Sequence, residues 1–267
     1  MESNMNIESK DFNYYITPKD GKYTHVIIFL HGLGDRAQSY IDFFLSQKVL
    51  PSDIPIKIVL LQSPYKRVIF DMPIATSWFE ISSFPLVSKE CYNFNEAENS
   101  KKNIEKVIHE EAKLIGGKYE NIYIGGFSQG GCLSLLVGLT FEHLLGGVIC
   151  LSGYLFSEIE IKEDKKNLNI FVGHGEADDV INYLTSMEEM KRIENFKGFE
   201  KHSYPEKGHT ITLEEIDQIR NFLSNCMSFF RVTMLLKAFK IFNFFHFFHT
   251  GQIINNIISF SMPHKNI

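Results

Sequence analysis

Residues 123–131 read Tyr-Ile-Gly-Gly-Phe-Ser-Gln-Gly-Gly, which places Ser128 between glycines on both sides. The residues before it predict a short buried strand over 121–125, and the apolar residues after it recur at helical spacing. A serine at a sharp turn from strand to helix is the nucleophile-elbow pattern, because the turn exposes the hydroxyl at the end of a sheet. Gly126 and Gly130 fit this pattern, since they let neighbouring segments approach without a Cβ. The alternative is a glycine-rich turn that only connects a strand to its crossover helix.

A serine nucleophile needs a histidine base and a carboxylate that orients the histidine. In folds with this elbow, the acid follows the serine along the chain and the histidine comes last. An acidic loop follows the predicted strand at 168–172 and offers Asp178 and Asp179, which spacing alone does not separate. Glu176 is a third candidate, and a merely solvated acidic loop is the alternative interpretation.

The predicted base is His209, which lies between a short strand ending at Pro205 and a helix that begins after Thr212. Thr212 and Glu215 have the spacing of a capping box, which marks the start of that helix. Loops between such elements commonly carry catalytic residues. His202 falls inside the strand and is the weaker alternative.

An oxyanion in the transition state also needs hydrogen-bond donors. In this arrangement one donor is the backbone N–H after the nucleophile, here Gln129, and the other comes from the loop after the first core strand. That strand covers 25–30 and leads into His-Gly-Leu-Gly-Asp, so we expect the N–H of Leu33 as the second donor. We expect His31 to be a structural hydrogen-bonding residue beneath this loop.

Together these motifs resemble the acyl-protein thioesterase family, also described as the lysophospholipase or phospholipase/carboxylesterase family, of the α/β-hydrolase fold. The resemblance covers residues from about 25 to 225, in the family's order and spacing. It selects Asp178 as the acid, because in the family a His-Gly pair is followed by two variable residues and then the catalytic aspartate. Asp179 stands where the family often has proline. The matching residues are 31–35, 77–80, 125–131, His174 and Gly175 with Asp178 and Ile181, and Gly208 with His209.

Along the chain, predicted strands alternate with helical segments, which indicates an α/β fold with a mostly parallel central sheet and helices on both faces. We expect a lead-in at 1–20, a single catalytic domain at 21–226 and a hydrophobic extension at 227–267. Asn95–Ile115 reads as a helix with Asn95 and Glu98 as its capping pair, ended by two glycines. The predicted strands lie near 24–30, 56–62, 121–125, 146–151, 168–172 and 199–204.

The segment 68–95 lies between the second predicted strand and that helix and is rich in aromatic, methionine and proline residues. We expect it to form a cap that lines an acyl groove beside Ser128, because a hydrocarbon chain is held by apolar walls. Met72, Trp78 and Phe79 are the candidate groove residues, with Trp78 more structural than catalytic. The alternative is ordinary packing of a long loop on the sheet.

The bulk composition agrees with this interpretation. The 267 residues, 44% of them hydrophobic, suffice for one large core, and the net charge of −5 argues against a general nucleic-acid binder. Four cysteines without a CxxC or metal-ligand spacing favour free thiols in a reducing cytosol. The polar N-terminus does not resemble a secretory signal, so we expect a cytoplasmic protein. The chemistry requires no metal and no organic cofactor.

The C-terminal extension is dense in phenylalanine but carries Arg231, Lys237 and Lys240 in its apolar stretch. These charges argue against a membrane-spanning helix. One hypothesis is a basic interfacial anchor that gives transient association with a membrane surface. The alternative is a poorly ordered extension or an altered reading frame at the end of the gene.

The expected function is a serine hydrolase that cleaves acyl thioesters and esters. Following the resemblance, its substrates would be S-acylated proteins, which it would depalmitoylate, and lysophospholipids. A small-ester carboxylesterase with the same residues is the first alternative. The second, from another class, is a non-catalytic protein that holds acyl chains.

Overall fold

The computed structural model describes residues 4–66, 74–86 and 88–228. The chain divides into two compact units, Met1–Cys226 and Met227–Ile267, and the sheet and the site belong to the first. Nearly all of the extension expected at 227–267 therefore lies outside the described residues.

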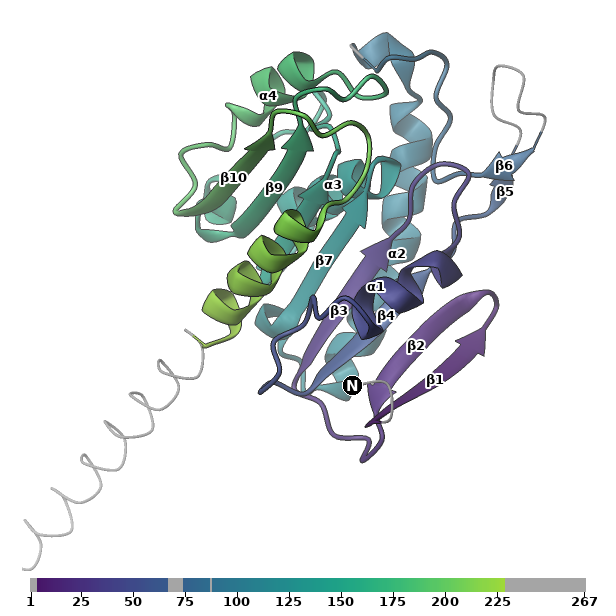
Figure 1. Ribbon diagram of the computed structural model, residues 1–267, viewed down its shortest axis with the longest axis vertical. Coiled ribbons are helices and arrows are strands. Elements are labelled where there is room, and N and C mark those ends of the chain that lie inside the picture. The colour runs from purple at the N-terminus through teal and green to yellow at the C-terminus, as the bar shows by residue number, and fades with distance from the viewer. Residues whose placement is uncertain (1–3, 67–73, 87, 229–267) are drawn as a thin grey trace, which may run out of the picture. The chain divides into compact units, whose positions relative to one another are not determined.

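In the described part of the chain, one sheet has eight strands in the order β1-β2-β4-β3-β7-β8-β9-β10 (Figure 1). The six strands from β4 to β10 in this order run parallel to one another, whereas β2 pairs antiparallel with both β4 and β1. This confirms the predicted α/β fold with a mostly parallel sheet. The strands are β1 Met5–Lys10, β2 Asn13–Pro18, β3 His25–Leu30, β4 Ile56–Leu61, β7 Ile122–Phe127, β8 Gly147–Leu151, β9 Asn169–Gly175 and β10 Gly198–Tyr204, with a separate pair β5 Tyr65–Lys66 and β6 Ala75–Thr76.

Helices cover both faces of this sheet. On one face, Phe29 of β3 packs on Phe44, with ring centroids 5.3 Å apart, and Phe171 of β9 packs on Phe222 at 5.7 Å. That face therefore carries α1 and the helical residues 213–226 of this unit. The helices are α1 Ile41–Leu45, α2 Phe94–Leu114, α3 Gln129–Thr140 and α4 Tyr183–Met190, with short 3-10 turns at Ala37–Tyr40, Lys89–Cys91, Tyr119–Asn121 and Glu163–Asn167.

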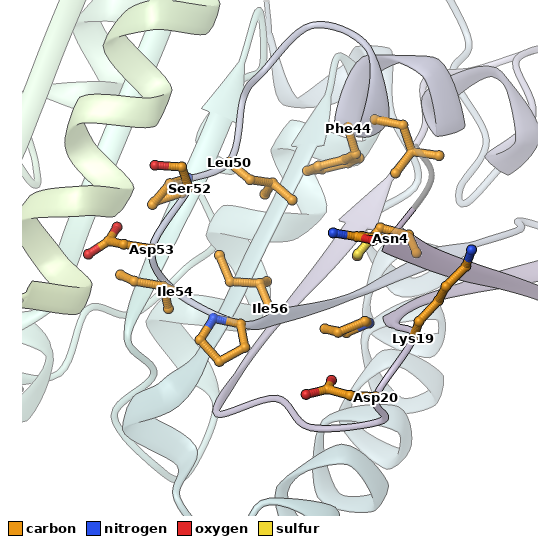
Figure 2. Close-up of a pocket in the computed structure, with 14 residues that line it drawn as sticks. Asn4, Lys19, Asp20, Phe44, Leu50, Ser52, Asp53, Ile54 and Ile56 are labelled. Carbon is orange, nitrogen blue, oxygen red and sulfur yellow. The ribbon is translucent and has the colours of Figure 1, made fainter. Parts of the chain in front are cut away.

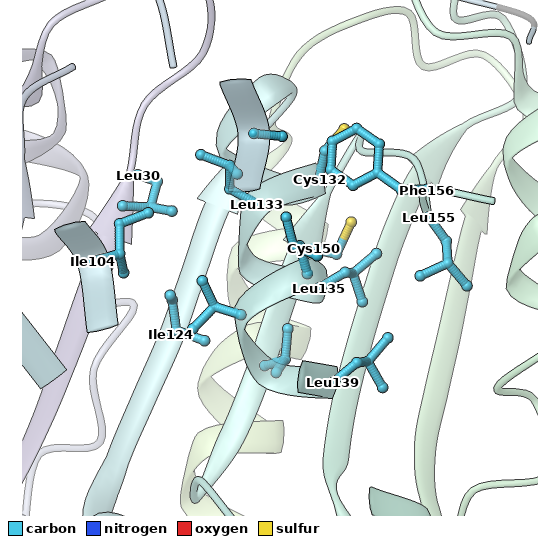
Figure 3. Packing of buried hydrophobic residues seen from close by; sticks show 14 of the residues in the cluster. Leu30, Ile104, Ile124, Cys132, Leu133, Leu135, Leu139, Cys150, Leu155 and Phe156 are labelled. Carbon is cyan, nitrogen blue, oxygen red and sulfur yellow. The ribbon is translucent and has the colours of Figure 1, made fainter. Parts of the chain in front are cut away.

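The other face of the sheet and helices α2 and α3 form the main hydrophobic core (Figure 3). Ile28 of β3 and Ile124 of β7 stand beside one another in register, so they point to the same side of the sheet. Leu133 and Leu136 of α3 pack there and are fully buried. α3 is apolar on nearly all sides, so it lies buried between the sheet and other elements. This packing holds its first residue, Gln129, in place.

Two sequence interpretations differ from the structure. Residues 5–18, which lie inside the expected lead-in, form β1 and β2 and extend the sheet. The capping residue of α2 is Asn93, whose side chain accepts a hydrogen bond from the N–H of Glu96, so the predicted cap at Asn95 is wrong. The side chain of Glu96 instead accepts from the N–H of Glu80, which ties the start of the helix to the cap segment.

Candidate active site

The turn between β7 and α3 carries Ser128, which has φ 55° and ψ −119°. A non-glycine residue with this positive φ is strained and persists only where the surroundings hold it. The surroundings here are close-packed, because a Cβ on Gly130 would collide with the carbonyl of Leu30 and a Cβ on Gly126 would collide with the backbone of Gly130. The glycines are therefore needed for this turn, as the motif predicted.

The three residues predicted as nucleophile, base and acid meet at the carboxyl ends of their strands. His209 Nε2 lies 2.8 Å from Ser128 Oγ, and His209 Nδ1 lies 2.7 Å from Asp178 Oδ2. Ser128 follows β7, Asp178 follows β9 and His209 follows β10, and parallel strands bring these ends to one edge of the sheet. An Asp–His–Ser line with these distances can transfer a proton from the hydroxyl to the imidazole.

The carboxylate of Asp178 is fully buried and fixed by further hydrogen bonds. Its Oδ1 accepts from the N–H groups of Val180 and Ile181, at 2.9 and 2.8 Å. Burial alone would raise the pKa of Asp178, but hydrogen bonds from His174 and His209 outweigh it and hold the pKa well below its usual range. Asp178 is therefore ionised throughout the neutral range and favours the imidazole tautomer with a proton on Nδ1.

The alternative acids and base point elsewhere. Asp179 and Glu176 are solvent-exposed. His202 lies within β10 and stacks on Phe171, with ring centroids 4.8 Å apart. The hydrogen-bonded line from Ser128 thus runs through the residues that the family resemblance selected.

The two predicted oxyanion donors are the backbone N–H groups of Gln129 and Leu33. Gln129 is the first residue of α3, and N–H groups in the first turn of a helix have no acceptor within the helix. Leu33 follows β3, and its neighbour Gly32 is so close to the serine that an added Cβ would lie 3.4 Å from Ser128 Cβ. Both residues line the same cavity as Ser128. The role of these two N–H groups as oxyanion donors stays a prediction.

Hydrogen bonds of His31 hold the loop that carries Leu33. Its Nδ1 donates to the carbonyl of Gly32 at 2.7 Å, and its Nε2 accepts the N–H of Ser63 at 3.0 Å. Burial lowers the pKa of His31, although its hydrogen bond to Gly32 acts in the opposite direction. His31 is a neutral structural residue in this arrangement, as expected from the sequence. Trp78 belongs to the same support, because its Nε1 donates to the carbonyl of His31 at 2.9 Å.

Sequence reasoning missed a role for the side chain of Gln129. Its Oε1 accepts the N–H of Trp78 at 2.8 Å, and its Nε2 donates to the carbonyl of Phe79 at 2.6 Å. The residue that follows the nucleophile therefore holds the cap segment against the elbow. No local pattern signals this contact, because the partners are about 50 residues apart.

An apolar cavity of about 280 Å³ opens beside Ser128. Phe79 lines it, as predicted, whereas Trp78 is buried against His31 and does not line it. Met72 lies outside the described residues. The cap and the acid loop meet at this cavity, because the N–H of Leu86 donates to the carbonyl of Val180 at 2.9 Å. The lining residues are Leu33, Phe79, Ile81, Phe84, Leu86, Ser128, Gln129, Cys132, Val180, Ile181 and His209.

A second cavity of about 580 Å³ lies between the start of the chain, the turn after β2 and the loop that leads into β4 (Figure 2). Phe44, Leu50, Ile54 and Ile56 form apolar walls, and charged residues stand at its rim. Ser128, Asp178 and His209 do not line it. The smaller cavity is therefore the candidate active site, because it alone of the two combines an apolar wall with the hydrogen-bonded nucleophile.

Two further properties bear on possible partners. Among residues 4–66, 74–86 and 88–228, no group of three or more histidine, cysteine or acidic side chains is arranged to hold a metal ion. Within the same ranges, no helix combines the length and apolar character needed to cross a membrane.

Several known proteins are similar to this chain over most of its length. Residues 13–227 match the model of the phospholipase/carboxylesterase family. The chain is similar to proteins named acyl-protein thioesterase 1 from Mycosarcoma maydis, with 34% identity over 78% of this chain and 94% of that protein, and from Neurospora crassa, with 31% identity over 78% and 89%. Among solved structures it is similar to SOBER1 of Arabidopsis thaliana, with a TM-score of 0.68 and 26% identity over 76% of this chain and 99% of the other. Acyl-protein thioesterase 2 of Zea mays shares the fold at a TM-score of 0.66 and 21% identity, over 80% and 98%.

Proposed function

The chain belongs to the phospholipase/carboxylesterase family of the α/β-hydrolase fold, and from this premise we propose that it depalmitoylates S-acylated proteins, with lysophospholipase activity at the same site. Membership of this family makes the chain a serine hydrolase, as the sequence predicted. The relatives named acyl-protein thioesterase 1, at 29 to 34% identity, support a thioester substrate.

In the proposed mechanism Ser128 attacks the carbonyl carbon of the acyl group while His209 Nε2 takes the hydroxyl proton across 2.8 Å. Asp178 holds the reactive tautomer and stabilises the imidazolium that forms. The N–H groups of Leu33 and Gln129 receive the oxyanion. His209 then protonates the leaving thiolate or alkoxide. A water molecule that gives a proton to His209 attacks the acyl-enzyme, the bond between Ser128 Oγ and the acyl carbon breaks to release the fatty acid, and His209 returns the proton to Oγ.

One observation carries this proposal. A continuous line of hydrogen bonds joins a buried, ionised Asp178 to a strained Ser128, and the line ends at an apolar cavity. A histidine and an aspartate that served packing alone would not need the serine in an unfavourable backbone conformation.

A fluorophosphonate probe and a hydrolysis assay test the assignment. The probe should label Ser128 in the parent chain, and Ser128→Ala should lose both labelling and hydrolysis, with kcat lower by several orders of magnitude. A parent chain that resists the probe and hydrolyses no acyl substrate would instead support the non-catalytic acyl-binding alternative. Near-parent hydrolysis by Ser128→Ala would end the assignment of the nucleophile.

The size of the cavity favours a second candidate activity, hydrolysis of smaller esters. The cavity of about 280 Å³ lies at the lower end of the roughly 300 to 1,000 Å³ that small-molecule sites have. Phe84 lines this cavity and is 48% exposed, so the cavity is open to solvent at this side chain. Comparing kcat/KM across thioesters and lysolipids of increasing chain length separates the two functions. For a long-chain hydrolase, kcat/KM keeps rising beyond about ten carbons, whereas for a small-ester carboxylesterase kcat/KM declines there.

Association with a membrane surface remains a separate proposal, which rests on the extension at 227–267. The helix that begins at residue 213 is described as far as residue 228, so a truncation after Ser228 keeps its described part intact. We expect the truncated protein to lose binding to vesicles and to keep its esterase activity. Equal binding by the full and truncated chains would contradict this proposal. Cytoplasmic residence is proposed with it, supported by the buried thiols of Cys132, Cys150 and Cys226.

A further inference from the structure

The loop that carries His209 is closed at its two ends by a buried ion pair. Lys207 Nζ lies 2.5 Å from Glu215 Oε2, and the two side chains are only 2% and 0% exposed. Lys207 precedes His209 by two residues, and Glu215 lies in the first turn of the helix that follows. The contact therefore encloses the short stretch of backbone from which the imidazole extends.

Glu215 holds its end of the loop by two kinds of contact. It forms the predicted capping box, in which its N–H donates to Thr212 Oγ1 at 3.3 Å and its Oε2 accepts from the N–H of Thr212 at 3.4 Å. Its Oε1 has no hydrogen-bond partner in the described part of the chain and lies against Gly173 of β9, where an added Cβ would collide with it. The carboxylate is thus held between the sheet and the loop.

Lys207 joins the histidine loop to the acid loop. Its carbonyl accepts the N–H of Ala177 at 3.1 Å, next to Asp178, and its N–H donates to the carbonyl of Tyr204 at the end of β10. A Cβ on Gly175 would collide with the Lys207 carbonyl, so the two loops touch through backbone. The ammonium group also lies 4.7 Å from the centre of the Tyr204 ring. A shift of Lys207 would therefore move the acid and the base relative to one another.

The surroundings of the pair include the charge that orients His209. Asp178 and Cys150 face Lys207, while His174 faces Glu215 and Glu214 lies near Tyr204. Burial lowers the pKa of Lys207 and raises that of Glu215, while the charge of each partner acts against that change. Asp178 attracts the Lys207 cation, so the pair acts electrostatically on the acid as well as sterically on the loop.

We propose that the Lys207–Glu215 ion pair is a positioning pair for His209, which fixes the imidazole between Asp178 and Ser128 and sets the local charge balance of the acid and base. The inference rests on the proposed function, in which His209 is the base. A buried ion pair is not by itself evidence for stability, because well-packed apolar residues of similar size often stabilise a protein as well. The backbone link to the acid loop gives the pair a role beyond packing.

The test uses the full chain with Lys207→Met, Glu215→Gln and the double variant. Glutamine can still serve in a capping box, so Glu215→Gln removes the charge and keeps the cap. Each protein is measured for kcat and KM on one short-chain thioester between pH 5 and 9, and for its thermal midpoint. In the folded single variants we expect kcat to fall about 10- to 100-fold with KM nearly unchanged, as for a misplaced catalytic group.

The pH profile gives a readout that a packing role would not change. Lys207→Met removes a cation near the Asp178–His209 couple, so the couple binds a proton more easily and the acidic limb of kcat/KM moves to higher pH. Glu215→Gln leaves the cation unbalanced, so the limb moves to lower pH. We expect each shift to be about half a pH unit or more. In the double variant the limb should return to the parent position and the thermal midpoint should recover, while kcat stays reduced.

A matched control is a second buried Lys–Glu pair, Lys57 and Glu111, whose charged atoms lie 2.7 Å apart and which joins β4 to α2. Lys57→Met should lower the thermal midpoint. Assayed at a temperature below this midpoint, it should keep the kcat and the acidic limb of the parent. Three results would overturn the inference: parent-like kcat and pH limb in folded single variants, limb shifts in the same direction, or full recovery of kcat in the double variant. Ser128→Ala in the same assay tests the proposed function separately. An active Ser128→Ala protein would contradict the proposed function, whereas the three results above concern the ion pair.

Discussion

The backbone of Ser128 gives a prediction that separates strain from chemistry. Alanine and glycine at this position both remove the hydroxyl, and with it the hydrogen bond to His209. Only glycine adopts φ 55° and ψ −119° without a steric cost from Cβ. Comparing the two variants therefore isolates the strain, because the loss of the hydrogen bond is common to both.

The magnitude follows from two opposing contributions. A residue in a sparsely populated backbone region costs about 1 to 3 kcal/mol. Glycine makes the unfolded chain more flexible, which costs about 0.5 to 1 kcal/mol relative to alanine. We therefore expect Ser128→Gly to have a free energy of unfolding about 1 kcal/mol larger than that of Ser128→Ala. For a domain of this size the difference corresponds to about 2 to 4 °C in the thermal midpoint.

Denaturant unfolding of both variants, followed by circular dichroism, measures the difference directly. The control is the same pair of substitutions at Ser134, which lies within α3, where glycine should be less stable than alanine by about 1 kcal/mol. The sign should thus reverse between the two serines. If Ser128→Gly were equal to or less stable than Ser128→Ala, the elbow would not be strained and the reasoning would be refuted.

Three further predictions concern the acid, the elbow and the cavity. Asp178→Asn should lower kcat by about 10⁴ with little change in KM, because the amide favours the wrong imidazole tautomer; equal rates of fluorophosphonate labelling in variant and parent would contradict this. Since the pKa of Asp178 is lowered in the folded protein, its contribution to stability is complete above about pH 4 and is lost as the pH falls through the folded-state pKa. Urea midpoints of parent and Asp178→Asn should therefore differ by a constant amount between pH 5 and 7 and converge at lower pH. Gly130→Ala should cost about 3 kcal/mol through its collision with the backbone, whereas Gly208→Ala, with its nearest atom at 3.9 Å, should unfold like the parent. Leu86→Trp should fill the cavity and abolish hydrolysis of long acyl chains while an acetyl ester is still cleaved, and unchanged chain-length dependence would exclude Leu86 from the acyl wall.

Much of the site could be predicted because its requirements are local. The glycines around Ser128 reflect a backbone approach that no side chain permits, and Thr212 with Glu215 reflects the unpaired N–H groups of a helix start. The acid was harder, because Asp178 and Asp179 are neighbours and spacing does not distinguish them. In the structure Asp178 turns inward and accepts from the N–H groups of Val180 and Ile181, which is a short-range hydrogen-bonded turn.

The first two strands were not predicted for identifiable reasons. β1 is almost wholly exposed, so it lacks the apolar alternation that marks a half-buried strand. The hairpin between β1 and β2 turns at Asp11 and Phe12, with φ 52° and 64°, where glycine or asparagine is the usual signal. Side-chain contacts between distant segments, such as that of Gln129 with the cap segment, likewise have no local pattern.

The structure also indicates which parts of the site can vary independently. Catalytic groups stand on turns fixed by glycines, by backbone contacts and by the helix start at residue 213. The hydrogen bonds that attach the cap segment around the cavity include those of the Gln129 side chain with Trp78 and Phe79 and that of the Leu86 N–H with Val180. Between these attachments lie Ile81 and Phe84. Both line the cavity, and the side-chain hydrogen bond of Ser128 is made with His209 instead. Substitutions between the attachments should therefore change which acyl chain is accepted while leaving the rate of probe labelling at Ser128 near that of the parent.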